Sequence, residues 1–309
     1  MRRLFFILLF IPCMLFAQDI HFSQWMHNPL FSSPALSGDF DGDYRINAQQ
    51  RGQWGSVSVP FSTTSLGGDM SLKKIGFGAQ LLLDNAGTSN LRNTQFNLSL
   101  ATELMGWRGG LQIGFAQRSI DYSQLVFPDG NETFPSESVS FLDVGVGITR
   151  QFNVAYDKIM KTGFSAFHLN KPNRSFVEND DLLTPRHQFF TQMNWVISEH
   201  WNLHPSVMFM RQNTHRSFFV GSKAQYDISD AYQKNIQLEF GTFYRWGDAV
   251  NILLGVQLEN THLVFGYDWN VSDLIPASNS LGAWEFSLTY IIHQSIPKRP
   301  GYKVCPIYL

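Results

Sequence analysis

The feature that most constrains the fold is a two-residue alternation of apolar and polar side chains. In residues 284–290, for example, Trp, Phe, Leu and Tyr alternate with Glu, Ser and Thr, and residues 250–259, 261–270 and 95–100 show the same pattern. Successive side chains of a β-strand point to opposite faces, so each segment has one apolar and one polar face. The pattern predicts an all-β protein.

Alternation alone fits a soluble sandwich as well as a membrane barrel, and three further features favour the barrel. The segments are long enough to cross a bilayer as tilted strands. The polar faces contain charged residues suited to a polar lumen: Glu239, Arg245, Glu259 and Glu285. Aromatic residues stand near the segment ends, as interfacial girdles do: Trp54, Trp107, Trp195, Trp201, Tyr244, Trp246, Trp269 and Tyr290. No long apolar run follows residue 17, which disfavours a helical membrane protein.

We therefore expect a transmembrane antiparallel barrel with an even number of strands. The predicted strands are 44–54, 61–70, 74–84, 91–102, 107–117, 140–150, 162–169, 187–197, 201–212, 216–227, 235–246, 249–259, 261–270 and 281–292. The longer connections 118–139 and 170–186 should project outside the bilayer. Residues 18–43, with Pro29, Pro34 and two glycines, do not read as a strand, and residues 293–309 form a C-terminal tail.

The N-terminus predicts export. Arg2 and Arg3 precede an apolar run that ends at Phe16, and Ala17 offers a small residue for cleavage. Residues 1–17 should be a signal peptide and 18–309 a single barrel domain of the Gram-negative outer membrane. The net charge of −2 disfavours nucleic acid as a partner. After cleavage Cys305 would be the sole cysteine, so no internal disulfide is expected.

Motifs for catalysis and cofactor binding are weak. His21 and His27 lie six residues apart but have no third metal ligand at a supporting spacing. The acidic run 178–181 lacks the alternation and glycine of a calcium loop. Scattered histidines, among them His204 and His262 that we place in the lumen, accompany no Gly-x-Ser-x-Gly motif. We expect a protein that is not an enzyme and has no metal or cofactor. A barrel hydrolase is the least favoured alternative.

Several motifs resemble, in order, those of the PorP/SprF family, which are outer-membrane components of the type IX secretion system in Bacteroidota. Phe22–Pro29 (FSQWMHNP) resembles the family's opening, although Ser33 stands where the family has Asn before Pro34-Ala35. Other matches are Arg51-Gly52-Gln53-Trp54, Asp84 with Gly87, His168–Asn173 (HLNKPN), Tyr267–Leu274 with Glu285–Tyr290, and Cys305-Pro306.

The resemblance implies a non-enzymatic barrel of the type IX secretion and gliding machinery. Its partners would be a secreted adhesin or other cargo with a type IX C-terminal signal, and envelope components of that machinery. The alternation alone fits a general porin or small-solute transporter equally well, which is the alternative function. Residues 19–40 are expected to plug the periplasmic mouth, because irregular backbone cannot face lipid; a disordered tail is the alternative. Candidate plug or partner-contact residues are Phe22, Ser23, Gln24, Trp25, Asn28, Pro29, Pro34, Arg51, Gln53, Trp54, Asn170, Pro172 and Asn173.

Overall fold

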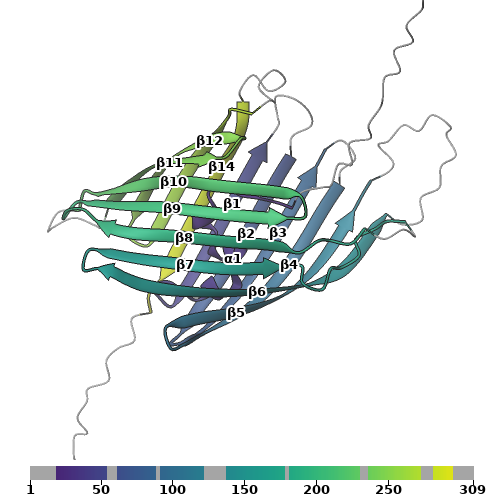
Figure 1. Cartoon of the computed structure of the whole chain (residues 1–309), viewed down its shortest axis with the longest axis horizontal. Helices are drawn as coiled ribbons and strands as arrows, with labels where there is room; N and C mark the ends of the chain where they lie inside the picture. The colour runs from purple at the N-terminus through teal and green to yellow at the C-terminus, as the bar shows by residue number, and fades with distance from the viewer. Residues whose placement is uncertain are drawn as a thin grey trace, which may run out of the picture.

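The chain folds into a closed antiparallel barrel in which each strand pairs with its neighbours in sequence and β1 pairs with β14 (Figure 1). The computed structural model describes residues 19–53, 61–87, 91–121, 137–177, 181–229, 236–272 and 281–294. Its strands are β1 (Tyr44–Gln53), β2 (Phe61–Leu72), β3 (Ile75–Ala86), β4 (Leu91–Leu104), β5 (Trp107–Ser119), β6 (Ser138–Ala155), β7 (Lys158–Phe167), β8 (Arg186–Val196), β9 (Trp201–Gln212), β10 (His215–Asp227), β11 (Ile236–Arg245), β12 (Ala249–Leu258), β13 (Thr261–Asn270) and β14 (Leu281–Ile292).

The predicted fourteen-strand barrel is confirmed, with most strand ends within two or three residues of those expected. The largest differences are at β6 and β7. β6 continues to Ala155 because its pairing with β7 persists through a register shift between Asn153 and Ala155. β7 ends at Phe167 rather than 169, because His168 has a positive φ of 58° that an extended strand does not allow.

The two faces of the strands confirm a membrane-type barrel and rule out a sandwich. Apolar side chains point outward and are exposed, for example Ile113 (63%) and Phe265 (50%). Polar and charged side chains such as Asp268 and Glu285 point inward and are buried. A water-soluble protein does not expose so extensive an apolar surface, whereas a lipid-facing barrel requires it. Among the described residues, no helix is long and apolar enough to cross a membrane.

The two ends of the barrel differ. At one end, which we call the short-turn end, two-residue turns join β2 to β3 and β12 to β13. Glu259 lies in the second of these turns, with φ 51°, and is exposed. Its expected place in the lumen is therefore wrong, because β12 stops one residue earlier than the alternation suggested. At the other end, the long-connection end, β5 is followed by residues 120 and 121 and β7 by residues 168–177, where the connections predicted at 118–139 and 170–186 begin; residues 122–136 and 178–180 of these connections lie outside the described residues.

The N-terminal segment, residues 19–43, lies inside the barrel (Figure 1). It contains a 3-10 helix η1 (Trp25–His27), one helical turn α1 (Pro29–Ser32) and a second 3-10 helix η2 (Pro34–Leu36). Pro29 and Pro34 each occupy the first helical position, where the missing N–H has no partner to lose. The lumen therefore holds a short irregular chain that packs against polar and apolar side chains of the wall.

Candidate functional site

Apolar side chains of the N-terminal segment pack against buried apolar side chains of the barrel wall. Trp25 is 1% exposed and packs against Phe190 at a ring distance of 5.8 Å. On the opposite side, Phe22 meets Phe31 edge-on at 5.1 Å and packs on Leu82 of β3. Burying a large apolar side chain stabilises a protein by roughly 1.5–3 kcal/mol, so these contacts favour the segment inside the barrel.

A buried charge cluster binds the start of the segment to the wall. The carboxylate of Glu285 accepts hydrogen bonds from the backbone N–H groups of Ser23 (2.7 Å) and Gln24 (2.8 Å). Arg51, which lies directly opposite Glu285 in the β1–β14 register, donates to the same carboxylate. Arg51 is buried as well, so the two opposite charges balance each other inside the lumen.

The hydroxyl of Ser23 completes this cluster, here named the Ser23 cluster. Ser23 Oγ donates to Asp268 Oδ2 (2.7 Å) and accepts from the guanidinium groups of Arg51 (3.0 Å) and Arg245 (2.7 Å). A hydroxyl has one donor and two acceptor positions, so all are used. The two arginines balance Glu285 and Asp268, which leaves a cluster without net charge. Ser23 of the N-terminal segment is therefore an integral part of the cluster.

The middle of the segment packs against two glycines of the barrel wall. η2 contacts β5 and β6 where Gly110 and Gly147 lie opposite each other in the sheet. A Cβ placed on Gly147 would lie 3.1 Å from Pro34 Cδ, and one on Gly110 would lie 2.6 Å from Ala35 Cα. Both distances are tighter than normal contacts, so only glycine lets the chain approach this closely.

Asn28 organises the turn that precedes α1. Its side-chain oxygen caps the helix by accepting from Phe31 N–H (3.3 Å), and it also accepts from Gln80 of β3 (3.0 Å). A single side chain therefore fixes both the local fold of the segment and its distance from the wall. Ser33 caps η2 in the same manner by accepting from Ala35 N–H, so the residue that departs from the family motif still performs a capping role.

At the short-turn end the segment is held by three cations of the wall. Arg45 pairs with Asp69 (2.7 Å), which also accepts from Gly38 N–H (2.7 Å). Arg108 donates to the carbonyl oxygen of Ala35 (2.9 Å). Lys161 pairs with Asp39 at 2.7 Å.

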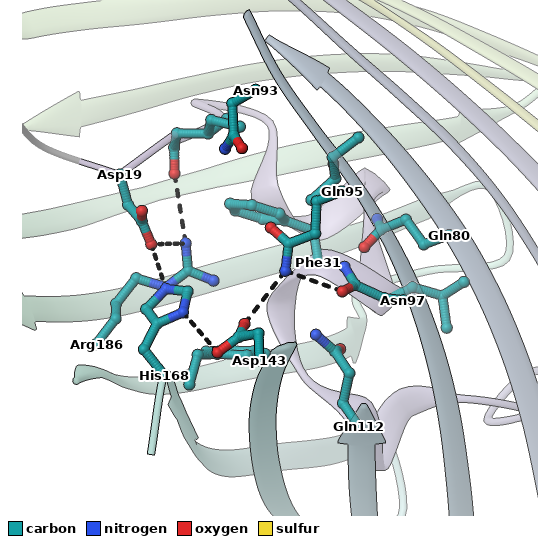
Figure 2. Close-up of a pocket in the computed structure, with 14 residues that line it drawn as sticks. Asp19, Phe31, Gln80, Asn93, Gln95, Asn97, Gln112, Asp143, His168 and Arg186 are labelled. Atoms are coloured by element: carbon teal, nitrogen blue, oxygen red, sulfur yellow. Dashed lines mark hydrogen bonds and ion pairs between the residues drawn. The ribbon is translucent and has the colours of Figure 1, made fainter. Parts of the chain in front are cut away.

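At the long-connection end the segment is held by Asp19. As Figure 2 shows, Asp19 contacts His168 Nε2 (2.6 Å) and Arg186 Nη1 (3.3 Å), and His168 Nδ1 contacts Asp143 (2.9 Å). Burial opposes the charge of His168, but Asp19 and Asp143 outweigh it and raise the pKa of His168 to about 9. Burial likewise opposes ionisation of Asp19, yet His168 and Arg186 hold its pKa well below the usual range.

The segment therefore does not sit at one mouth, as expected from sequence, but runs from the long-connection end at Asp19 to the short-turn end at Asp43. The prediction placed the segment at one mouth because it was based only on the rigidity of the irregular backbone. The ion pairs at both of its ends determine how far it extends.

Beyond Asp19 lies a cavity of about 880 Å³. Charged side chains of its lining include Asp84, Arg118, Arg174 and Asp248, together with Arg51 and Arg245 of the Ser23 cluster. Arg118 and Arg174 share one carboxylate, that of Asp181, at 3.2 and 3.1 Å. Among the described residues, two guanidinium groups therefore face one carboxylate here.

The structure brings most of the candidate residues predicted from sequence into this assembly. Phe22, Ser23, Gln24, Trp25, Asn28, Pro29, Pro34 and Arg51 all lie in it or against it, and Gln53 accepts from Arg51 (3.1 Å) and lines the cavity. Trp54 falls outside the described residues.

Asn170, Pro172 and Asn173 do not join this assembly. Asn170 binds the backbone of Leu142 and Val144, and Asn173 accepts from two backbone N–H groups of its own connection. They build a turn that supports the long connection.

Asp19, Asp143 and Arg186 were not among the residues predicted from sequence, because each is a single charged residue on a different element and no local motif marks it. Asp268 lies in the Tyr267–Leu274 motif, but no contact was predicted for it. His27 was considered for metal binding only together with His21, which lines the cavity instead. In the folded chain His27 faces Glu239, at 3.1 Å from Nε2 to Oε1.

Comparison with known proteins agrees with this architecture. The chain is similar to the toluene transporter TbuX of Ralstonia pickettii, with TM-score 0.55 and 11% identity, covering 86% of this chain and 94% of that one. It is also similar to the toluene transporter TodX of Pseudomonas putida, with TM-score 0.51 and 9% identity, covering 87% and 94%. At these identities the likeness shows the fold alone. No curated protein sequence matches significantly.

The family model of the type IX secretion system membrane protein PorP/SprF matches residues 14–290. The match spans the N-terminal segment, the Ser23 cluster and nearly all of the barrel. The chain therefore belongs to the PorP/SprF family of type IX secretion system membrane proteins.

Proposed function

We propose that the protein is a non-enzymatic outer-membrane component of the type IX secretion and gliding machinery that binds a secreted surface protein. The observation that carries the proposal is the buried N-terminal segment. It occupies the lumen and is bound by ion pairs at both ends, while a polar cavity remains at the long-connection end. This arrangement suits binding of a partner better than passage of solutes.

The orientation follows from the two ends of the barrel. Outer-membrane barrels have short turns in the periplasm and longer loops outside the cell. By this rule the cavity opens outward, where an exported adhesin with a type IX C-terminal signal would be anchored. The short-turn end would face the other envelope components of the machinery.

The charge of the cavity defines the partner chemistry. Arg118 and Arg174 share Asp181, whose side chain is 45% exposed and can be exchanged for a carboxylate of the partner. An acidic segment of the cargo would then bind two guanidinium groups, an arrangement that favours bidentate contacts.

A co-purification experiment in native detergent extract tests this proposal. The Arg118→Ala/Arg174→Ala double variant should recover at least tenfold less adhesin than wild type, the effect of losing about 1.4 kcal/mol of binding. Arg216→Ala is the matched control, because Arg216 lies at the same end of the barrel but is exposed and does not line the cavity. Equal recovery from both variants, or normal adhesin display in a strain lacking the protein, would contradict the proposal.

A general porin or small-solute transporter is the second candidate, and the similarity of fold to two proteins described as toluene transporters is what favours it. Planar-bilayer recordings distinguish the two functions. The wild-type protein should show no large steady conductance, because the N-terminal segment occupies the lumen. A stable open pore in the intact protein would favour the porin.

A further inference from the structure

A second buried cluster lies in the short-turn half of the lumen, apart from the Ser23 cluster. It consists of His27 from the N-terminal segment, Glu239 from β11 and His262 from β13. His27 Nε2 lies 3.1 Å from Glu239 Oε1, and His262 Nε2 lies 3.3 Å from Glu239 Oε2. The side chains of His27 and Glu239 are 4% and 1% exposed.

The contacts in this cluster are close, but they are not hydrogen bonds. Nε2 of both histidines and Oε1 of Glu239 are buried and have no hydrogen-bond partner of acceptable geometry. Buried polar atoms nearly always have a hydrogen-bond partner, so three buried atoms without one in the same cluster require an explanation. One ligand atom from each of the three side chains lies within 4.8 Å of the other two.

We propose that His27, Glu239 and His262 form a binding site for a divalent transition-metal ion such as Zn²⁺. Two ligands at about 2.1 Å from a tetrahedral zinc ion lie roughly 3.4 Å apart. The distance from each histidine Nε2 to its nearer Glu239 oxygen, 3.1 Å to Oε1 for His27 and 3.3 Å to Oε2 for His262, is close to this value. Two imidazoles and one carboxylate favour zinc and its neighbours over Mg²⁺ or Ca²⁺, which prefer oxygen ligands. A fourth position remains for water, and the 16% exposure of the His262 side chain provides access from solvent.

The other groups around the cluster orient the carboxylate. Lys223 (2.9 Å) and Gln225 (3.0 Å) both donate to Glu239 Oε2, which leaves Oε1 directed at His27. His204 does not enter the site, because its Nε2 contacts Gln225 at 2.7 Å. Outer contacts of this kind fix a ligating carboxylate in place. A bound ion would join η1 directly to β11 and β13.

The test uses the full-length mature protein in detergent, after removal of any affinity tag and treatment with EDTA. Isothermal titration with ZnCl₂ should give one site per chain. His27→Ala and His262→Ala should each weaken binding at least tenfold, since changing even an outer contact costs about 10- to 100-fold. His187→Ala is the matched control, because His187 is on the exposed face of β8. Co²⁺ should give the absorption bands of tetrahedral coordination, and both variants should lose them.

A second measurement separates loss of the site from loss of the fold. Heat-modifiable migration in gels reports whether each variant has formed its barrel; His262→Gln replaces any variant that has not. Zn²⁺ should also slow hydrogen exchange of residues 22–30 in wild type but not in the His262 variant. The proposal is overturned if Zn²⁺ does not bind to wild type. It is also overturned if Zn²⁺ binds with equal affinity to wild type and to the folded His27 and His262 variants.

Discussion

Replacement of Glu285 by Gln should release the start of the N-terminal segment while the barrel stays closed. The amide has the shape of the carboxylate but only one acceptor oxygen. Of the two N–H groups that Glu285 now binds, one would face the NH₂ group of the new side chain. Arg51 would lose a buried ionic partner, and the Ser23 cluster would carry a net positive charge.

The magnitude follows from these losses. Breaking a buried ion pair on one side costs about 3 to 5 kcal/mol. Each loss of roughly 1.4 kcal/mol lowers an equilibrium constant tenfold. The ratio of docked to released segment should therefore fall roughly a hundred- to several-thousand-fold. The strand hydrogen bonds are untouched, so the cost falls on the segment rather than on the barrel.

Hydrogen–deuterium exchange resolved by peptide measures this ratio. Amides of residues 22–31 should lose protection in Glu285→Gln, while amides of β3 to β9 keep theirs. Glu103→Gln is the matched control, because Glu103 is exposed on β4. If the segment is as protected in Glu285→Gln as in Glu103→Gln, the Ser23 cluster does not hold it in place.

Three other outcomes are expected. Gly110→Val should expel η2 and raise protease cleavage in the segment, whereas Gly109→Val, with open space at its Cβ, should not; equal cleavage would contradict the close-approach argument. Because the pKa of His168 is raised to about 9, its attraction to Asp19 is complete below the ordinary pKa and is lost as pH rises through about 9. Exchange of residues 19–24 should therefore accelerate through that range, and a pH-independent rate, corrected for intrinsic exchange, would disprove the link. Asn28→Ala should weaken docking by about 1 to 2 kcal/mol through loss of the α1 cap, measured by the same exchange, and an unchanged rate would show that the cap is dispensable.

Sequence reasoning predicted the strands well because alternation is a local property. β13 and β14 begin and end where expected because their alternation is regular, and β9 also matches although its segment alternates poorly. His168 shows the limit of the method. Its backbone conformation, which ends β7, depends on contacts with Asp19 and Asp143 far away in sequence.

The anchoring contacts could not be predicted for the same reason. Ser23 and Glu285 are 262 residues apart in sequence, and although each lies in a recognisable motif, neither motif indicates that the two residues meet. His27 likewise acquires its partners from β11 and β13, so a search for ligands at fixed spacing had nothing to find. The family resemblance indicated which residues of the segment matter, but only the closed barrel shows what they contact.

The position of the Ser23 cluster has a consequence for assembly. Arg51 and Glu285 face each other across the junction of β1 and β14, the last two strands that must meet, which are 234 residues apart at this pair. Closing so long a loop is entropically costly and occurs late. The N-terminal segment supplies Ser23 and Gln24 to the same junction, so the closed seam joins β1, β14 and this segment at one carboxylate. A chain that lacks or misplaces its first residues would still pair Arg51 with Glu285, but the carboxylate at the seam would lose the N–H donors of Ser23 and Gln24, and the closed junction would be less stable.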